Sequence, residues 1–234
     1  MGYVNAASEF LNFMSTIGRA PDSGTVLSRQ APGIPFASWQ RGTVEQVAVH
    51  LEGATSDIWF SVNPMIVPES GRGGADRVTG LAALFADLDG DIGKLESGEW
   101  CDKVIEAVEV RLGRPASAIV NSGHGRHPYW PLHGPGTSWA FGDVEARDQA
   151  AAVLKRFGAL VESVAVEVRG CTRADYDQAI GYQRPPLSSG RPAPARWVDP
   201  GVFELARVLR VPGTTNHKSD PVPVELLRPN GFRT

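Results

Sequence analysis

Helical spacing of apolar residues predicts three substantial helices in this chain. The first covers roughly residues 5–17. The second runs over residues 97–112 and a third begins at Asp143, each after a typical N-cap residue. Their apolar faces consist of Phe10, Leu11 and Met14 in the first helix, Cys101, Ile105, Val108 and Leu112 in the second, and Ala150, Leu154, Phe157 and Val161 in the third.

Short apolar runs between these helices predict strands. The run over residues 81–88 is continuous and ends in acid, which is typical of a buried strand with functional side chains at its exit. Residues 184–197 hold four prolines and three arginines and predict a loop. The irregular alternation predicts an α+β (α/β) fold, with helices packed behind a sheet. Further strands are expected over residues 57–62, 118–121, 128–132 and 222–227, the second and third as a hairpin, and a short helix over 200–206.

The composition is that of an ordinary globular protein. Of the 234 residues, 42% are hydrophobic and 21% are charged, which is enough to bury a core. No apolar run approaches the ~20 residues that span a bilayer, and no signal peptide is evident. We therefore expect no membrane contact and a cytoplasmic location. Cys101 and Cys171 are too few for a disulfide framework or a four-cysteine zinc site.

Charge is unevenly distributed along the chain. The formal net charge is -3, but residues 1–168 hold 13 Lys/Arg against 20 Asp/Glu (net -7) and residues 169–234 hold 10 against 6 (net +4). A locally basic surface in the second part could contact a phosphate backbone despite the acidic total. Chance asymmetry explains the same numbers equally well.

Asp87 and Asp89 lie two residues apart at the end of the predicted strand over residues 81–88. Side chains at this spacing point to the same face of a strand, so the two carboxylates are expected roughly 6–7 Å apart. Mg²⁺ and Mn²⁺ prefer such oxygen ligands and accept a substrate phosphate as a further ligand. The pair therefore predicts a divalent cation site.

Residues 122–127 (SGHGRH) combine two glycines with two histidines and an arginine. The glycines allow backbone N–H groups to approach an anion. The Ser122 hydroxyl can donate a hydrogen bond, and Arg126 or a protonated His127 can supply positive charge. The alternative is a purely structural role as a hydrogen-bonded side chain. It applies more to His124 than to His127.

Residues 207–218 (RVLRVPGTTNHK) form a cationic run. Arg207 and Arg210 share a face if the preceding short helix continues through them. Arginine binds phosphate oxygens in pairs and lysine acts as a point charge, so these two arginines and Lys218 predict phosphate binding. The apolar residues between them argue against a surface cluster, because a half-buried arginine needs an anionic partner.

Together and in this order, the three segments resemble the archaeo-eukaryotic-type primase-polymerase (prim-pol) superfamily, especially its phage- and plasmid-borne bacterial members. That family has an Asp-x-Asp/Glu at a strand end, a Ser-x-His-type loop and, in phage and plasmid members, an Arg-x-x-Arg-x-Pro-Gly-Thr-x-Asn-x-Lys run. The match extends over residues 87–218. In the first 80 residues only SVNP (61–64) and RGG (72–74) can be aligned, and the cysteine-rich zinc module of some relatives is absent.

The resemblance implies one catalytic domain over residues 1–234. Residues 81–234 would form a modified RRM-like catalytic sheet with packed helices, and residues 1–80 a small N-terminal α/β part. The chain could be the N-terminal domain of a larger helicase-primase.

The resemblance also implies the residues of the site. Asp87, Asp89 and a third carboxylate would hold two Mg²⁺ or Mn²⁺ ions. Asp199, in a hydrophobic-Asp-x-x-hydrophobic context, is the first candidate for the third carboxylate, and Glu204 is the alternative. The nucleotide would be bound by Ser122, His127, Arg207, Arg210 and Lys218.

The implied reaction is template-directed nucleotidyl transfer in phage or plasmid replication, in the cytoplasm of a bacterial host. The substrates would be a single-stranded DNA template and NTPs or dNTPs. A primer 3′ end would be a further substrate if the protein extends primers. A helicase domain or other replication proteins would be partners.

Two other functions compete. Residues 85–90 (FADLDG) closely resemble the signature of haloacid-dehalogenase-like, Mg²⁺-dependent phosphatases, with Asp87 as nucleophile. In that family Thr or Val usually follows the glycine, where this chain has Asp91, and the motif usually lies near the N-terminus. The second alternative is a non-catalytic single-stranded-DNA-binding replication module with a decayed site, whose binding would depend steeply on salt.

Overall fold

Two antiparallel sheets form the centre of the molecule. The structure is a computed structural model, and it describes residues 6–17, 24–29, 39–49, 51, 56–69, 71–132 and 139–229. The strands are β1 (Gly24–Arg29), β2 (Trp39–Gly42), β3 (Asp57–Ser61), β4 (Gly80–Leu81), β5 (Ala83–Phe85), β6 (Leu88–Asp89), β7 (Ala118–Asn121), β8 (Gly125–Pro131), β9 (Trp139–Ala140), β10 (Val208–Arg210), β11 (Thr215–Asn216), β12 (Val222–Pro223) and β13 (Glu225–Pro229). One sheet has the order β13-β7-β8-β5, with β6 also paired to β8, and the other has the order β10-β3-β1-β2. Two short pairs, β4-β9 and β11-β12, complete the strand pairing.

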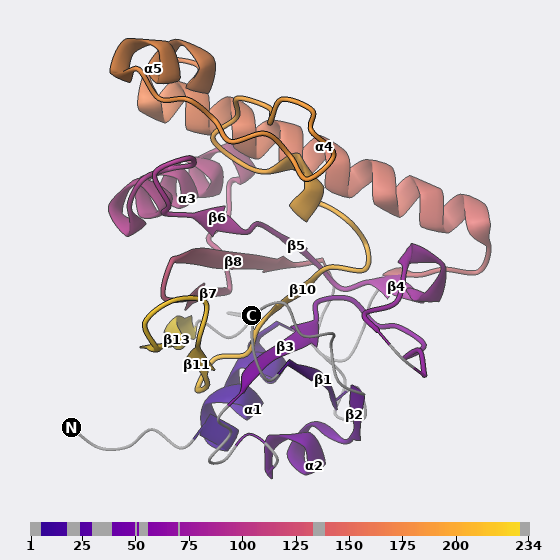
Figure 1. The fold of residues 1–234 in the computed structure, drawn as a ribbon. Coiled ribbons are helices and arrows are strands. Elements are labelled where there is room, and N and C mark those ends of the chain that lie inside the picture. Colours follow the sequence, from indigo (N-terminus) through magenta and orange to yellow (C-terminus); the bar gives the residue numbers. More distant parts are fainter. Residues whose placement is uncertain are drawn as a thin grey trace.

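Helices cover the outer side of each sheet. In Figure 1, α3 and α4 lie above the β13-β7-β8-β5 sheet, whereas α1 and α2 lie at the bottom beside the other sheet. None of the helices in the described ranges is long and apolar enough to cross a bilayer. The helices are α1 (Ala6–Thr16), α2 (Val44–Val49), α3 (Gly98–Leu112), α4 (Val144–Arg169) and α5 (Arg173–Ile180), with 3-10 turns at Ala75–Arg77 and Pro200–Val202.

The two sheets share one hydrophobic core, and α1 joins them. The Phe13 ring of α1 lies edge-on to Phe60 of β3 and to Tyr129 of β8, with ring centroids 5.1 Å apart in both pairs. All three rings are fully buried. Edge-to-face aromatic packing adds to the free energy of burial, so this trio stabilises the junction of the sheets.

The last part of the chain contributes a strand to each sheet. β10 pairs with β3, with Leu209 opposite Phe60, and β13 pairs with β7. The sheet of the predicted N-terminal α/β part therefore contains a strand from residues 208–210. This arrangement places the cationic run beside β3.

The predicted α+β class is confirmed, with antiparallel sheets, packed helices and an N-terminal α/β part. Two of the three predicted helices begin at the predicted N-caps. Ser97 accepts a hydrogen bond from the Trp100 N–H and Asp143 accepts one from Ala146. The hairpin of residues 118–132 is also confirmed as β7 and β8. Asn5, the predicted start of the first helix, lies outside the described residues.

The continuous strand predicted over residues 81–88 is interrupted. It forms β4, β5 and β6, although β5 and β6 keep one register against β8, with Phe85 opposite Tyr129 and Leu88 opposite Arg126. The gap between them lies opposite Pro128, which has no N–H to donate to the ladder. The same register places Asp87 opposite His127.

The predicted helix over residues 200–206 is wrong beyond its first turn. Only Pro200–Val202 is helical, as a 3-10 turn, and Val208–Arg210 is strand β10. The apolar residues of β10 extend the buried surface of β3, which favours strand over helix here. The predicted shared helical face of Arg207 and Arg210 therefore does not exist.

Replacement of Phe13 tests the junction of the sheets. Phe13→Ala should lower the free energy of unfolding by ~3–5 kcal/mol, because it leaves a cavity between Phe60 and Tyr129. Urea unfolding followed by circular dichroism measures the change. Val110→Ala, at an exposed position of α3, is the control and should change stability by no more than ~0.5 kcal/mol. Equal effects of the two substitutions would contradict the assigned packing.

Candidate active site

Asp87, directly before β6, lies between the side chains of a histidine and an arginine. One carboxylate oxygen lies 3.1 Å from His127 Nε2, on the neighbouring strand β8. The other oxygen accepts a hydrogen bond from Arg207 Nη2. His127 is nearly fully buried, and the Asp87 side chain is 14% exposed. Two predicted nucleotide-binding residues therefore meet at a predicted metal ligand.

The two aspartates have opposite electrostatic environments. Burial disfavours the ionised form of Asp87, but the charges and hydrogen bonds of His127 and Arg207 outweigh it, so the pKa of Asp87 lies well below its usual range. Burial and the nearby charge of Asp87 raise the pKa of Asp89 to about 6, although Lys218 and Lys94 oppose the shift. Asp87 is thus a fixed anion, and Asp89 is the carboxylate that gains most from a bound cation.

The turn of residues 122–125 approaches the aspartates closely. Gly123 has φ 88°, and a Cβ on Gly125 would lie 2.0 Å from the Leu88 carbonyl oxygen, so both positions require glycine. The Ser122 carbonyl accepts a hydrogen bond from Asn216 Nδ2 at 2.6 Å, which links this turn to β11. The predicted loop over residues 122–127 is shorter in the structure, because β8 already begins at Gly125.

Arg126, a predicted source of charge, has another role. Its Nε lies 2.9 Å from an Asp102 carboxylate oxygen on α3, and Nη1 donates to Asn121 Oδ1 at 2.9 Å. Arg126 therefore fixes the hairpin against α3. His124 Nε2 lies 3.2 Å from the Ser219 hydroxyl.

Arg210 has a buried partner that the sequence pattern did not reveal. Its Nη1 donates to the carboxylate of Asp57, the first residue of β3, which is 1% exposed. The guanidinium carbon also lies 4.5 Å from the centre of the Trp59 ring. Burial opposes ionisation of Asp57, but hydrogen bonds from Arg210 and the His217 N–H lower the pKa of this carboxyl. The one indication in the sequence is that Asp57 is an acidic residue at the start of a largely apolar run.

These residues surround a pocket of about 120 Å³ between the two sheets. Lys218 lies at its rim, where its Nζ is 2.9 Å from Asp91 Oδ2, and it is half exposed. The pocket brings together all the predicted site residues except the third carboxylate. Its lining consists of Trp59, Asp87, Asp89, Ser122, His124, His127, Arg207, Val208, Leu209, Arg210, Asn216 and Lys218.

Comparison with known proteins gives matches among solved structures. No family model matches the sequence, and no curated protein matches it. The AEP domain of the cyanophage S-2L primase-polymerase (PrimPol) is similar with a TM-score of 0.54 and 13% identity, over 97% of this chain and 92% of that chain. The catalytic domain of primase RepB′ in complex with initiator DNA has a TM-score of 0.52 and 11% identity, over 99% of this chain and 88% of that chain.

The chain has the fold of primase-polymerase catalytic domains. A second structure of primase RepB′ agrees, with a TM-score of 0.53 and 12% identity, and this chain spans 58% of its length. The fold implied by the resemblance to the prim-pol superfamily, which was inferred from three short motifs, is therefore confirmed.

The two candidates for the third carboxylate lie outside the pocket lining. Asp199 is half exposed, accepts a hydrogen bond from the Gly201 N–H, and lies 3.8 Å from Lys94 Nζ. Glu204 forms an ion pair of 2.8 Å with Arg72. Within the described ranges, no group of three or more His, Cys, Asp or Glu side chains is arranged to hold a metal ion. The structure thus brings together two of the three predicted metal ligands.

Asp87 and Asp89 nevertheless fit a Mg²⁺ or Mn²⁺ ion. Both supply oxygen ligands. Burial and then the negative charge of Asp87 raise the pKa of Asp89, and a bound cation would offset both effects. Among the described residues, no side chain donates a hydrogen bond to the Asp89 carboxylate. Two carboxylates with water and substrate phosphate are a typical ligand set for Mg²⁺.

Asp89 should destabilise the metal-free protein at neutral pH. The folded protein takes up a proton at Asp89 near pH 6, whereas the unfolded chain does so only at a lower pH. The free energy of unfolding should therefore rise by about 1.3 kcal/mol as the pH falls from 7 to 5. Asp89→Asn should be more stable at pH 7 and lack this pH dependence, as measured by urea unfolding in a chelator. Asp148→Asn, at an exposed site of α4, should behave like the unmodified protein; an identical profile for Asp89→Asn would contradict the assignment.

A double-mutant cycle tests the pairing of Asp57 with Arg210. Asp57→Asn and Arg210→Gln should each destabilise the protein, because each leaves a buried charge without its partner. The coupling free energy in urea unfolding should be about 1–3 kcal/mol. The exposed pair of Glu99 and Lys103 on α3, 2.8 Å apart, is the matched control and should give about 0.3–0.5 kcal/mol. Equal coupling in the two cycles would show that burial adds nothing at Asp57.

Proposed function

We propose that this protein is a DNA primase or polymerase that performs metal-dependent, template-directed nucleotidyl transfer. The observation that carries the proposal is the aspartate pair at β6. Asp87 is paired with His127 and Arg207, whereas no side chain among the described residues donates a hydrogen bond to Asp89 in the same pocket. The prim-pol fold supports it, because the same pocket joins all three motifs.

Asp87 and Asp89 would hold Mg²⁺ or Mn²⁺, with Asp199 or Glu204 as the third carboxylate in a two-ion site. When bound, the ions would activate the primer 3′-hydroxyl and stabilise the pyrophosphate leaving group. Asp199 lies beside Lys94, whose charge acts on Asp89, whereas Glu204 is paired with Arg72. Asp199 therefore remains the first candidate.

The cationic side chains would bind the triphosphate. Arg207 is bound to Asp87, and Lys218 is bound to Asp91 at the rim. An incoming phosphate would therefore replace these carboxylates as the partner of each cation. Ser122 and His127 line the opposite side of the pocket on the hairpin. Donors fixed before the substrate arrives stabilise developing charge without reorganisation, and they hold the α-phosphate for in-line attack.

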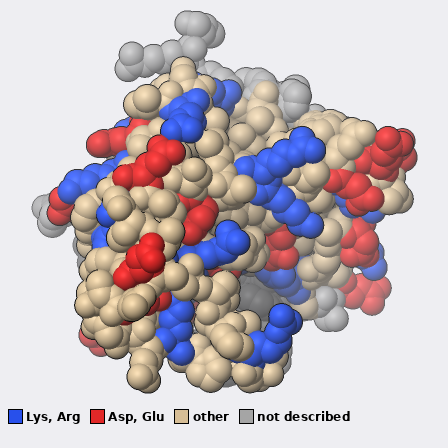
Figure 2. All heavy atoms as spheres, turned by 90° about the horizontal axis from the view of Figure 1, so that it is seen from above, with Lys and Arg blue, Asp and Glu red and all other residues tan. Residues whose placement is uncertain are grey.

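A single-stranded DNA template is the proposed partner, since one of the similar structures is a primase bound to initiator DNA. The net charge of +4 in residues 169–234 does not produce a uniformly basic surface. On the face seen from above, Lys and Arg side chains are interspersed with Asp and Glu (Figure 2). We therefore propose that DNA contacts are local to the pocket rather than spread over that face, with NTPs or dNTPs as substrates and replication proteins such as a helicase as partners.

The phosphatase alternative is less well supported. A nucleophilic aspartate needs a free oxygen directed at the substrate, whereas both oxygens of Asp87 are engaged, one by His127 and the other by Arg207. The similar structures carry the prim-pol fold instead. A non-catalytic DNA-binding module would not require the close, buried pairing of acid and base at β6.

Nucleotide incorporation on single-stranded DNA, with and without a primer and in Mg²⁺ or Mn²⁺, tests the proposal. Asp87→Asn and Asp89→Asn should each lower incorporation by about 10³-fold or more, while binding of single-stranded DNA is retained. Asp148→Asn on α4 is the control and should retain full activity. Incorporation that survives in Asp89→Asn would exclude the metal assignment, and DNA binding without any incorporation by the unmodified protein would favour the non-catalytic module.

A further inference from the structure

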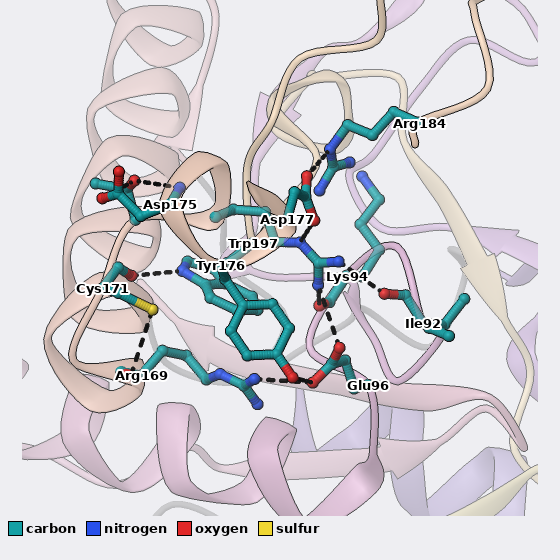
Figure 3. Close-up of polar contacts among 12 residues, drawn as sticks. Ile92, Lys94, Glu96, Arg169, Cys171, Asp175, Tyr176, Asp177, Arg184 and Trp197 are labelled. Atoms are coloured by element: carbon teal, nitrogen blue, oxygen red, sulfur yellow. Dashed lines mark hydrogen bonds and ion pairs between the residues drawn. The ribbon is translucent and has the colours of Figure 1, made fainter. Parts of the chain in front are cut away.

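A second polar cluster lies where the loop that follows Asp89 meets α5. Ile92, Lys94, Glu96 and Asp177 are drawn close together there (Figure 3). Arg173, the first residue of α5, is fully buried among them. Its Nη1 donates to the Lys94 carbonyl at 2.5 Å, its Nη2 to the Ile92 carbonyl at 2.9 Å, and its Nε to Asp177 Oδ1 at 2.6 Å. One guanidinium thus binds two backbone carbonyls of a single loop.

Aromatic rings enclose this guanidinium. Its central carbon lies 4.8 Å from the Trp197 ring centre, 5.2 Å from Tyr176 and 5.5 Å from Tyr182. Tyr182 also contacts the loop directly, since a Cβ on Gly93 would lie 3.1 Å from its hydroxyl oxygen. Removal from water strengthens the cation's interactions with its partners. The loop is therefore fixed by directional hydrogen bonds in an enclosed site.

Glu96, at the far end of the loop, is held in an unfavourable backbone conformation. Its φ is 75°, and no other non-glycine residue in the described ranges has a positive φ. The Glu96 carboxylate accepts hydrogen bonds from Arg169 Nη2 at 2.8 Å and from the Tyr176 hydroxyl at 3.0 Å. Such conformations persist where surrounding contacts impose them, and they concentrate at functional sites.

The loop connects this cluster to the aspartate pair. The Leu95 N–H donates to the Asp89 carbonyl at 3.0 Å, and the Gly90 N–H donates to the His124 carbonyl at 2.7 Å. Lys94 lies within ion-pair distance of Asp199, and its charge acts on Asp89. A change in the conformation of residues 90–96 would therefore move Asp89 and the charge beside it.

We propose that Arg173 and Glu96 are positioning residues that hold residues 90–96 in the conformation that directs Asp89 into the pocket for cation binding. The inference rests on the proposed function in so far as the cation serves nucleotidyl transfer. The side-chain hydrogen bonds of Arg173 and Glu96 within the described residues go to other parts of the molecule than the pocket lining, so their effect on the reaction would be transmitted through the loop.

Trypsin provides a direct test, because Arg173 binds the carbonyl of the Lys94–Leu95 peptide bond. Arg173→Lys keeps the charge and the number of tryptic sites but cannot bind both carbonyls in the same way. In the folded Arg173→Lys variant, we expect cleavage after Lys94, monitored by mass spectrometry, to be at least ~10-fold faster than in the unmodified protein. This ratio corresponds to a change of ~1.4 kcal/mol in the free energy of local opening. Arg111→Lys is the matched control, since Arg111 joins α3 to α4 through Glu167 at 2.8 Å on the surface.

Mn²⁺ binding measured without substrate by electron paramagnetic resonance is the second readout. Arg173→Lys should weaken it several-fold, whereas the nucleotide KM at saturating Mn²⁺ should stay within about twofold, because Arg207, Arg210 and His127 are not displaced. Glu96→Gln should change cleavage and Mn²⁺ affinity in the same direction, and it carries the test if Arg173→Lys does not fold.

Unchanged cleavage after Lys94, or unchanged Mn²⁺ affinity, would overturn the proposal. Equal acceleration at tryptic sites throughout the chain would overturn it as well, because it would indicate a purely structural role. Neither the cleavage after Lys94 nor the Mn²⁺ affinity requires nucleotide incorporation, unlike the nucleotide KM. A failure of the proposed function would appear as absent incorporation by the unmodified protein, with the cleavage and Mn²⁺ results still interpretable.

Discussion

The ion pairs of Asp87 connect the two sheets of this protein. The carboxylate lies at the edge of β6, its partner His127 is on the adjacent strand, and Arg207 comes from the segment that enters β10 in the other sheet. A buried carboxylate is tolerated only with close, well-directed partners, so the positions of all three side chains depend on one another. Because Asp87 stays ionised, Asp89 beside it is held at a potential that favours a cation.

A second buried aspartate repeats this arrangement on the other side of the pocket. Asp57 of β3 binds Arg210 and the backbone of His217, so the cationic run is fixed at both arginines. Each arginine is therefore oriented by a protein anion before any phosphate arrives. Partners of this kind would lower the reorganisation needed on binding of an anion, whereas competition with them would limit the affinity for an anion that arrives without a cation to bridge it to the aspartates.

The sequence predicts features whose determinants are local. Ser97 and Asp143 cap their helices within three residues, and the hairpin that carries His127 follows from two short apolar runs. The contents of the pocket were predicted from three motifs, but not the pairing of Asp57 with Arg210, because the partners are 153 residues apart and only the folded sheet brings them together.

Other elements had weak or misleading local signals. The helix α5 (RADYDQAI) has few apolar residues and is defined by the contacts of Arg173, so helical spacing did not reveal it. The strand β10 lies just before Pro212-Gly213, and the sequence allowed the preceding short helix to continue through it. Pairing with β3 rather than local propensity decides its conformation. The short strands β1 and β2 and the helix α2 were likewise not predicted. The third carboxylate, Asp199, was predicted from the residues around it in the sequence. In the structure the same residues form a 3-10 turn, and the Asp199 side chain caps its N-terminus.

The position of β10 has a consequence for the life of the nascent chain. Residues 207–218 emerge from the ribosome after both aspartates and the hairpin, and they supply β10, Arg207, Arg210 and Lys218. Until then Asp87 has only His127, β3 has an unpaired edge, and the pocket has no cationic side. Pairing over such sequence separations is slow compared with local folding. Chains in which residues 207–218 have not yet paired with β3 would thus carry an acidic, incomplete cleft, and the pocket would be completed in a single late step.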